Sequence, residues 1–114
     1  MAKEIVVVPQ GQEESLFSSL LELGFTFVNP ASEEISGWSE EGRQVFLDID
    51  AGLDAFRIGV GIQVWRGAGN DLNLVRDFEE ETIRVWLDGW SAEESAEIMS
   101  HLSGSGIVFE IDYD

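Results

Sequence analysis

Residues 43–65 have the sequence RQVFLDIDAGLDAFRIGVGIQVW, which carries the most regular hydrophobic alternation of the chain. Val45, Leu47 and Ile49 occupy every second position of its first half, and a similar run fills its second half. Alternation with a period of two, rich in β-branched and aromatic residues, is typical of half-buried antiparallel strands. The pattern therefore predicts a long β-hairpin over 43–65, with residues 51–54 as its turn.

A turn of this length also sets the register of the predicted hairpin. Asp48 would face Arg57 as a cross-strand ion pair on the polar face, and Ile49 would face Phe56 in the core. Favourable cross-strand pairs of this kind contribute about 0.2–1 kcal/mol each. The outer face of the hairpin would then combine acidic residues, glycines and a tryptophan.

The rest of the chain is expected to cover or extend this hairpin. Helical periodicity appears at 11–23 and 91–103, and the second stretch opens with the capping-box sequence SAEE. Strands are expected at 5–8, 25–28, 82–88 and 107–113, a loop at 31–42, and an irregular strand or a helical turn at 71–78. The order β-α-β, β-hairpin, β-α-β predicts one α+β domain over 1–114. Its mixed, mainly antiparallel sheet of about five to six strands would carry two helices on one face, as a ferredoxin-like variant.

The composition of the chain is strongly acidic. Its 114 residues include 6 Lys and Arg against 23 Asp and Glu, which gives a formal net charge of −17. Because 44% of the residues are hydrophobic, the chain is not a disordered acidic tail. Self-repulsion of so much charge destabilises a compact body, so the charge points to a basic partner, to life at high salt or to a need for solubility. It opposes direct binding to DNA, RNA or anionic membranes, which select for Lys and Arg.

The chain offers few residues for catalysis, since it has no cysteine, one histidine and one tyrosine. We therefore expect no enzymatic activity and no cofactor. His101 falls near the end of a predicted helix, where a positive imidazole is mildly favourable. The carboxylates from Asp48 onward resemble a cation-binding loop, but Leu53 and Gly59 stand where an EF-hand needs Gly and Glu. No metal ligand is assigned, although an irregular calcium or magnesium site stays open.

Nothing in the sequence indicates a membrane or secretory segment. The apolar run at 5–8 is too short for the hydrophobic region of a signal peptide, and no stretch approaches the ~20 apolar residues of a membrane span. A cytoplasmic monomer or homodimer is expected.

Carboxylates recur in pairs and ladders along the chain. Those at the two predicted helix starts are explained by the helix dipole, which favours anions there. In strands, residues i and i+2 lie about 6.7 Å apart on one face, comparable to the step between phosphates along a nucleic-acid strand. Trp65 and Trp86 fall on polar strand faces among these acids, as at an interface hot spot with a charged rim. The alternative is that a helix or the 31–42 loop covers them.

These features favour an acidic inhibitor or immunity-type protein that neutralises a basic, nucleic-acid-handling protein by DNA or RNA mimicry. Anti-CRISPR and toxin-immunity proteins are functional classes with this physical profile. The expected partner-binding residues are Asp48, Asp50, Trp65, Glu79, Glu80, Glu81, Trp86, Glu110 and Asp112. Two alternatives stay open, namely a small domain adapted to high salt and a calcium- or magnesium-binding module.

Overall fold

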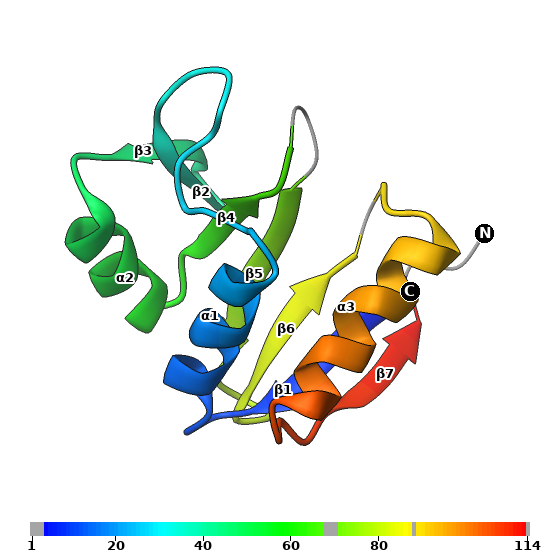
Figure 1. Cartoon of the computed structure of the whole chain (residues 1–114). Coiled ribbons are helices and arrows are strands. Elements are labelled where there is room, and N and C mark those ends of the chain that lie inside the picture. Colours follow the sequence, from blue (N-terminus) through cyan, green and yellow to red (C-terminus); the bar gives the residue numbers. More distant parts are fainter. Residues whose placement is uncertain (1–3, 68–70, 88, 114) are drawn as a thin grey trace.

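The computed structural model describes residues 4–67, 71–87 and 89–113. In these residues seven strands form one antiparallel sheet in the order β3-β2-β4-β5-β6-β1-β7, accompanied by three helices (Figure 1). The strands are β1 (Glu4–Pro9), β2 (Ile35–Ser39), β3 (Gly42–Phe46), β4 (Gly61–Trp65), β5 (Asp71–Asp77), β6 (Thr82–Trp86) and β7 (Glu110–Tyr113). The helices are α1 (Glu13–Glu22), α2 (Ile49–Arg57) and α3 (Ala92–Gly104). The α+β class is confirmed, but the sheet has more strands and the chain one more helix than the sequence predicted.

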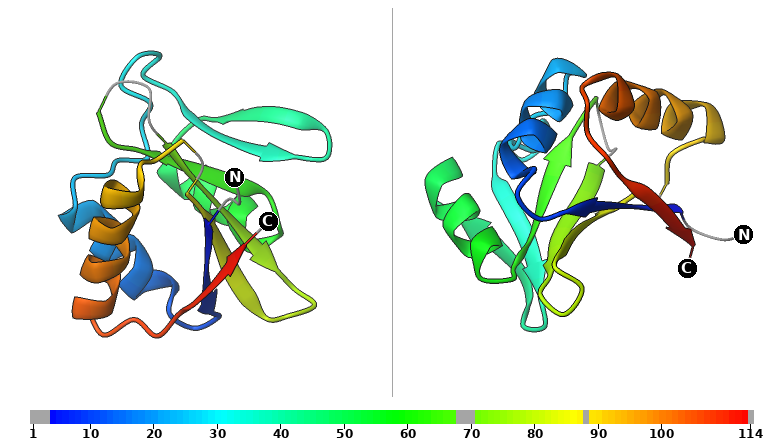
Figure 2. Two further views of the ribbon diagram at one scale, coloured as in Figure 1. Left: turned by 90° about the vertical axis from the view of Figure 1, so that its right-hand side faces the viewer. Right: turned by 90° about the horizontal axis from the view of Figure 1, so that it is seen from below.

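Six of the elements, β1, α1, β5, β6, α3 and β7, follow the order β-α-β-β-α-β, which is that of the ferredoxin-like motif. Strand β1 lies between β6 and β7, and β5 borders β6. Helices α1 and α3 contact each other and cover one face of the sheet (Figure 2). The remaining elements, β2, β3, α2 and β4, enter the chain between α1 and β5 and extend the sheet beyond β5.

The two predicted helices at 11–23 and 91–103 are confirmed as α1 and α3. Leu16 and Leu20 of α1 are almost completely buried, as the periodicity requires. At the start of α3 the Ser91 hydroxyl accepts a hydrogen bond from the Glu94 backbone N–H at 3.1 Å, and the Glu94 carboxylate accepts one from the Ser91 N–H at 3.4 Å. This reciprocal capping satisfies two donors that a helix start otherwise leaves unpaired.

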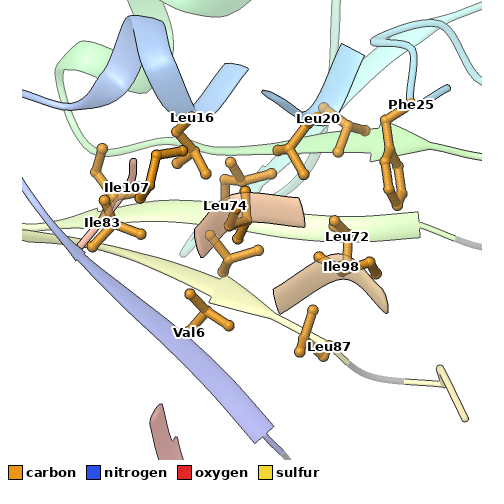
Figure 3. Close-up of a cluster of buried hydrophobic side chains, with 14 of the residues drawn as sticks. Val6, Leu16, Leu20, Phe25, Leu72, Leu74, Ile83, Leu87, Ile98 and Ile107 are labelled. Carbon is orange, nitrogen blue, oxygen red and sulfur yellow. The ribbon is translucent and has the colours of Figure 1, made fainter. Parts of the chain in front are cut away.

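The hydrophobic core lies between α1 and α3 on one side and the sheet on the other. Figure 3 shows side chains of this core from both layers, among them Leu16 of α1, Ile98 of α3 and Leu74 of β5. The strand residues of the core are Val6, Val8, Ile62, Val64, Leu72, Leu74, Ile83 and Val85. Since side chains alternate along a strand, the intervening residues face away from α1 and α3.

The predicted hairpin over 43–65 is wrong, because its central part forms helix α2. Its two strand-like ends belong to β3 and β4, which are separated in the sheet by β2. The expected ion pair between Asp48 and Arg57 does not form, and Arg57 pairs instead with Asp54, one helical turn earlier. The physical reason is that Ile49, Leu53 and Phe56 also follow the helical spacing i, i+4, i+7, and α2 buries them against the core.

Asp48 starts this helix. Its backbone is extended, with φ of −152° and ψ of 178°, and its carboxylate accepts a hydrogen bond from the Ala51 N–H at 2.9 Å. Asp50 in the first turn and Arg57 in the last turn complement the helix dipole. The carboxylates that looked like a strand ladder are therefore a helix cap and a first-turn acid.

The structure also refines the expectations for the remaining segments. The loop expected at 31–42 contains β2, which pairs with β3, and the strand expected at 25–28 is reduced to two isolated bridges of Thr26 and Val28. The ambiguous stretch 71–78 is strand β5. The strand expected at 82–88 is β6, although residue 88 lies outside the described residues, and the strand expected at 107–113 begins only at Glu110.

The capping role of Asp48 gives a direct test of helix α2. Replacing Asp48 with Ala should lower the free energy of unfolding by about 0.5–2 kcal/mol, whereas Asp48→Ser should lose much less because serine is also a good N-cap. Urea denaturation followed by circular dichroism measures both changes. An equal loss in the two variants would contradict the cap and favour a role for the negative charge itself.

Candidate protein-binding face

The face of the sheet that points away from α1 and α3 is here called the open face. It carries the side chains that alternate with the core residues along each strand. Directly opposed residues of antiparallel strands share a face, so the register places two rows of side chains across it. The first row is Trp38, Gly61, Val75, Arg84, Val7 and Glu110, and the second is Gln63, Asn73, Trp86, Ile5 and Asp112. Both rows cross the sheet from the inserted strands to β7.

Arg84 lies in the middle of the open face and binds two carboxylates. Its Nε lies 3.4 Å from Asp77 Oδ2, and its Nη1 lies 3.4 Å from Asp112 Oδ2. Asp71 and Glu110 occupy the same face of β5 and β7. Arg43 of β3 lies opposite Trp38 and shares this face. The open face therefore combines two arginines with four carboxylates, and its net charge is negative.

The carboxylate of Asp77 also caps the turn between β5 and β6. The backbone N–H of Glu80 donates to Asp77 Oδ1 at 3.1 Å and holds the pKa of Asp77 below the ordinary value of an aspartate. Partial desolvation acts in the opposite direction, while the Arg84 side chain and the Glu79 N–H lower this pKa further. Asp77 is thus a carboxylate that the fold keeps ionised.

A buried polar chain joins the inserted strands to β5. The Ser36 hydroxyl donates to Gln63 Oε1 at 2.7 Å, and Gln63 Nε2 donates to Asp71 Oδ2 at 2.7 Å. Ser36 is fully buried and Gln63 nearly so. Because a buried polar group without a partner is costly, this chain fixes the positions of β2 and β4 relative to β5.

A hollow of about 440 Å³ lies on the open face between Trp38 of β2 and Trp86 of β6. Gly61, Asn73 and Val75 also line it. A Cβ atom at position 61 would lie 3.2 Å from the Trp38 carbonyl oxygen, so only a glycine leaves this part of the hollow bare without moving β2. Trp38 is 50% exposed, and its indole is therefore available to a partner.

Two acidic hairpin ends border the open face. The β2–β3 turn carries Glu40 and Glu41, and the β5–β6 turn carries the run 79–81. Figure 2 shows that both hairpins project from the side of the sheet opposite α1 and α3. The hollow therefore lies on a surface whose projecting ends are negatively charged.

The structure brings most of the residues predicted for partner binding to this surface. Trp65, Trp86, Glu110 and Asp112 occupy strand positions of the open face, and Glu79, Glu80 and Glu81 lie at the end of the β5–β6 hairpin. The structure does not place Asp48 and Asp50 with them, because both belong to the start of α2.

Trp65 differs from Trp86 in its surroundings. It is half-buried, exchanges two backbone hydrogen bonds with Thr26, and its buried Nε1 has no hydrogen-bond partner among the described residues. Asn73 and Val75 were not predicted from the sequence, and Trp38 was expected in a loop rather than in a strand. Gly61 was expected on the outer face of the predicted hairpin, and it does lie on the open face.

Other chemically distinctive groups have structural roles. His101 Nε2 lies 3.3 Å from Glu22 Oε2 and so links α3 to α1. Within the described residues no group of three or more His, Cys, Asp or Glu side chains could hold a metal ion. Among the described helices none is long and apolar enough to cross a membrane.

Comparison with protein-family models, curated proteins and solved structures gave no match to this chain.

The environment of Asp77 predicts a pH dependence. An NMR titration of its carboxyl group should give a pKa below the ordinary value of an aspartate, and Arg84→Gln should raise that pKa. Because the folded-state pKa is the lower one, the carboxylate stabilises the fold above a pH of about 4, and this contribution disappears as the pH falls through the folded-state pKa. A normal or raised pKa for Asp77 would show that the turn does not bind the carboxylate as described.

The close approach of β2 to β4 predicts that residue 37 must be glycine. A Cβ atom there would lie 1.9 Å from the Gly61 carbonyl oxygen, so Gly37→Ala should cost about 1–3 kcal/mol of stability or more. The matched control is Gly104→Ala, where a Cβ atom would meet nothing within 4 Å. If thermal melts showed Gly37→Ala to be as stable as the control, β2 would not lie where the structure places it.

Proposed function

We propose that this protein is an acidic inhibitor or immunity-type protein that binds a basic, nucleic-acid-binding protein through the open face. It would compete with nucleic acid for the partner's basic groove. The observation that carries this proposal is that the arginines form ion pairs with carboxylates of the same chain, which leaves the surface negatively charged.

Each of the five arginines of the sequence is paired with a carboxylate of the same chain. The pairs are Arg43 with Glu34, Arg57 with Asp54, Arg66 with Glu97, Arg76 with Glu13, and Arg84 with Asp77 and Asp112. Their positive charge is neutralised by ion pairs within the same chain, while the formal charge of the whole chain is −17. The surface field is therefore negative, which attracts a basic partner and repels nucleic acid.

The carboxylates of β7 supply the part that would imitate a phosphate backbone. Glu110 and Asp112 are exposed and lie opposite Val7 and Ile5, so both face the open side. Residues two apart on a strand are separated by about 6.7 Å, a spacing comparable to that of successive phosphates. Their position on an edge strand leaves them accessible to a long basic groove.

The hollow supplies the apolar part of the interface. Stable complexes depend on a few buried aromatic or arginine side chains surrounded by polar contacts. Trp38 and Trp86 line this hollow, on the side of the sheet from which the acidic β2–β3 and β5–β6 hairpins project. Charge would accelerate the encounter with the partner, and the tryptophans would slow its dissociation.

Affinity capture tests this proposal. The protein is immobilised and incubated with a nuclease-treated lysate of its source organism, and the retained proteins are identified by mass spectrometry. We expect the retained proteins to be basic nucleic-acid-binding proteins. Raising the salt from about 50 to about 200 mM should release them, because salt weakens binding through charge. Duplex DNA should also release them, because it competes for the same basic groove.

Two matched variants locate the binding surface. Glu110→Gln with Asp112→Asn removes two charges from the open face, and Glu14→Gln with Glu93→Gln removes two from the starts of α1 and α3. Only the first pair should reduce capture, by roughly tenfold or more at moderate salt. Capture that resists both salt and DNA, or equal losses in the two double variants, would contradict charge mimicry by this face.

A melt at low salt separates this proposal from adaptation to high salt. An inhibitor of this kind should keep its cooperative thermal transition when the salt is removed, whereas a domain that depends on screening of its charge should unfold. Unfolding in low-salt buffer would therefore favour the salt-adapted alternative.

A further inference from the structure

Two tryptophans from distant parts of the chain line the same hollow. Trp38 comes from β2 of the inserted elements and Trp86 from β6, and Asn73 and Val75 lie between these strands on β5. With a volume of about 440 Å³, the hollow is large enough for the end of one long side chain. Its aromatic walls and the net negative charge of the open face restrict which side chain fits.

The molecule already contains an arrangement of the same chemistry. The guanidinium of Arg66 lies 5.1 Å from the ring centroid of Phe25 and 5.2 Å from that of Trp90, and its Nη1 lies 2.7 Å from Glu97 Oε1. One arginine therefore contacts two aromatic rings and a carboxylate at once. The face of an aromatic ring attracts a cation, and tryptophan does so most strongly.

We propose that the hollow receives an arginine side chain of the basic partner, which inserts between Trp38 and Trp86. This inference rests on the proposed function and names the anchor of the complex. The negative charge of the open face favours a cation over an apolar side chain. Arginine fits better than lysine because its planar guanidinium is weakly hydrated and stacks on aromatic rings.

The polar groups of the hollow fit the same occupant. The Asn73 amide oxygen can accept a hydrogen bond from a guanidinium N–H, and no arginine of this chain lines the hollow. A guanidinium can donate to this acceptor, whereas an apolar side chain would leave it without a partner.

An NMR titration tests this inference with a small probe. The ¹⁵N-labelled full chain is titrated with N-acetyl-arginine methylamide, and the indole N–H signals of all tryptophans are followed. We expect saturable shifts for Trp38 and Trp86 and none for Trp90, whose Nε1 donates to the Asp71 carbonyl at 2.7 Å and whose ring already contacts Arg66. The lysine analogue should bind more weakly, and the neutral citrulline and leucine analogues should cause no saturable shift.

Variants connect the shifts to the hollow. Trp38→Ala should weaken the apparent affinity for the arginine probe by roughly two- to fivefold, the effect of losing one exposed cation–π contact. Trp38→Phe should retain most of it. Leu21→Ala removes another exposed apolar side chain, on α1, and should leave the titration unchanged.

Two results would overturn the inference. One is the absence of saturable shifts at Trp38 and Trp86, and the other is an equal response to the citrulline or leucine analogue, which would make the hollow a site for an uncharged side chain. Either result, combined with capture of a basic partner that depends on Glu110 and Asp112, would leave the proposed function standing. Arginine binding with capture of only neutral or acidic proteins would contradict the proposed function and support the chemistry of the hollow.

Discussion

The backbones of Gly37 and Gly61 approach so closely that a single Cβ atom at position 37 would overlap the carbonyl oxygen of residue 61. This contact joins β2 to β4, and β4 in turn borders β5 and the rest of the sheet. It sets Trp38 directly opposite Gly61, and through β5 it brings Trp38 to the same hollow as Trp86. Without two glycines here, β2 would lie farther from β4, and the open face would lose one wall of its hollow.

The sheet has two faces with different tasks. One is buried by α1 and α3, and its side chains form the core. The other is open, and there the alternation of the strands places carboxylates, amides and tryptophans together. Arg84 binds two of these carboxylates and so reduces repulsion in the middle of the face. Glu110 on β7 and the acids of the hairpin ends are left to act on a partner. A stable fold and a strongly negative surface can therefore coexist in one small chain.

The parts of the fold that the sequence predicts correctly are those in which local signals agree. Leu16 and Leu20 mark the buried side of α1, and the capping box at Ser91 marks the start of α3. Helix α2 was missed because the residues on either side of 51–54 follow the strand period and residues 51–54 suit a hairpin turn. Ile49, Leu53 and Phe56 also follow the helix period, and the sequence alone does not decide between the two. Strand β2 was missed because Ser36 and Gly37 interrupt its hydrophobic pattern, and both are required by contacts with β4 that are remote in sequence. The hollow could not be predicted from the sequence, since it depends on that missed strand.

Side-chain footprinting of the complex measures the central claim most directly. Hydroxyl radicals oxidise exposed tryptophan, leucine and methionine side chains, and mass spectrometry compares the free protein with the protein bound to its captured partner. The account predicts that binding protects Trp38 and Trp86, while Leu21 on α1 and Met99 on α3 are oxidised as in the free protein. Protection of Leu21 and Met99 with unchanged oxidation of both tryptophans would place the partner on the helical side and contradict the account.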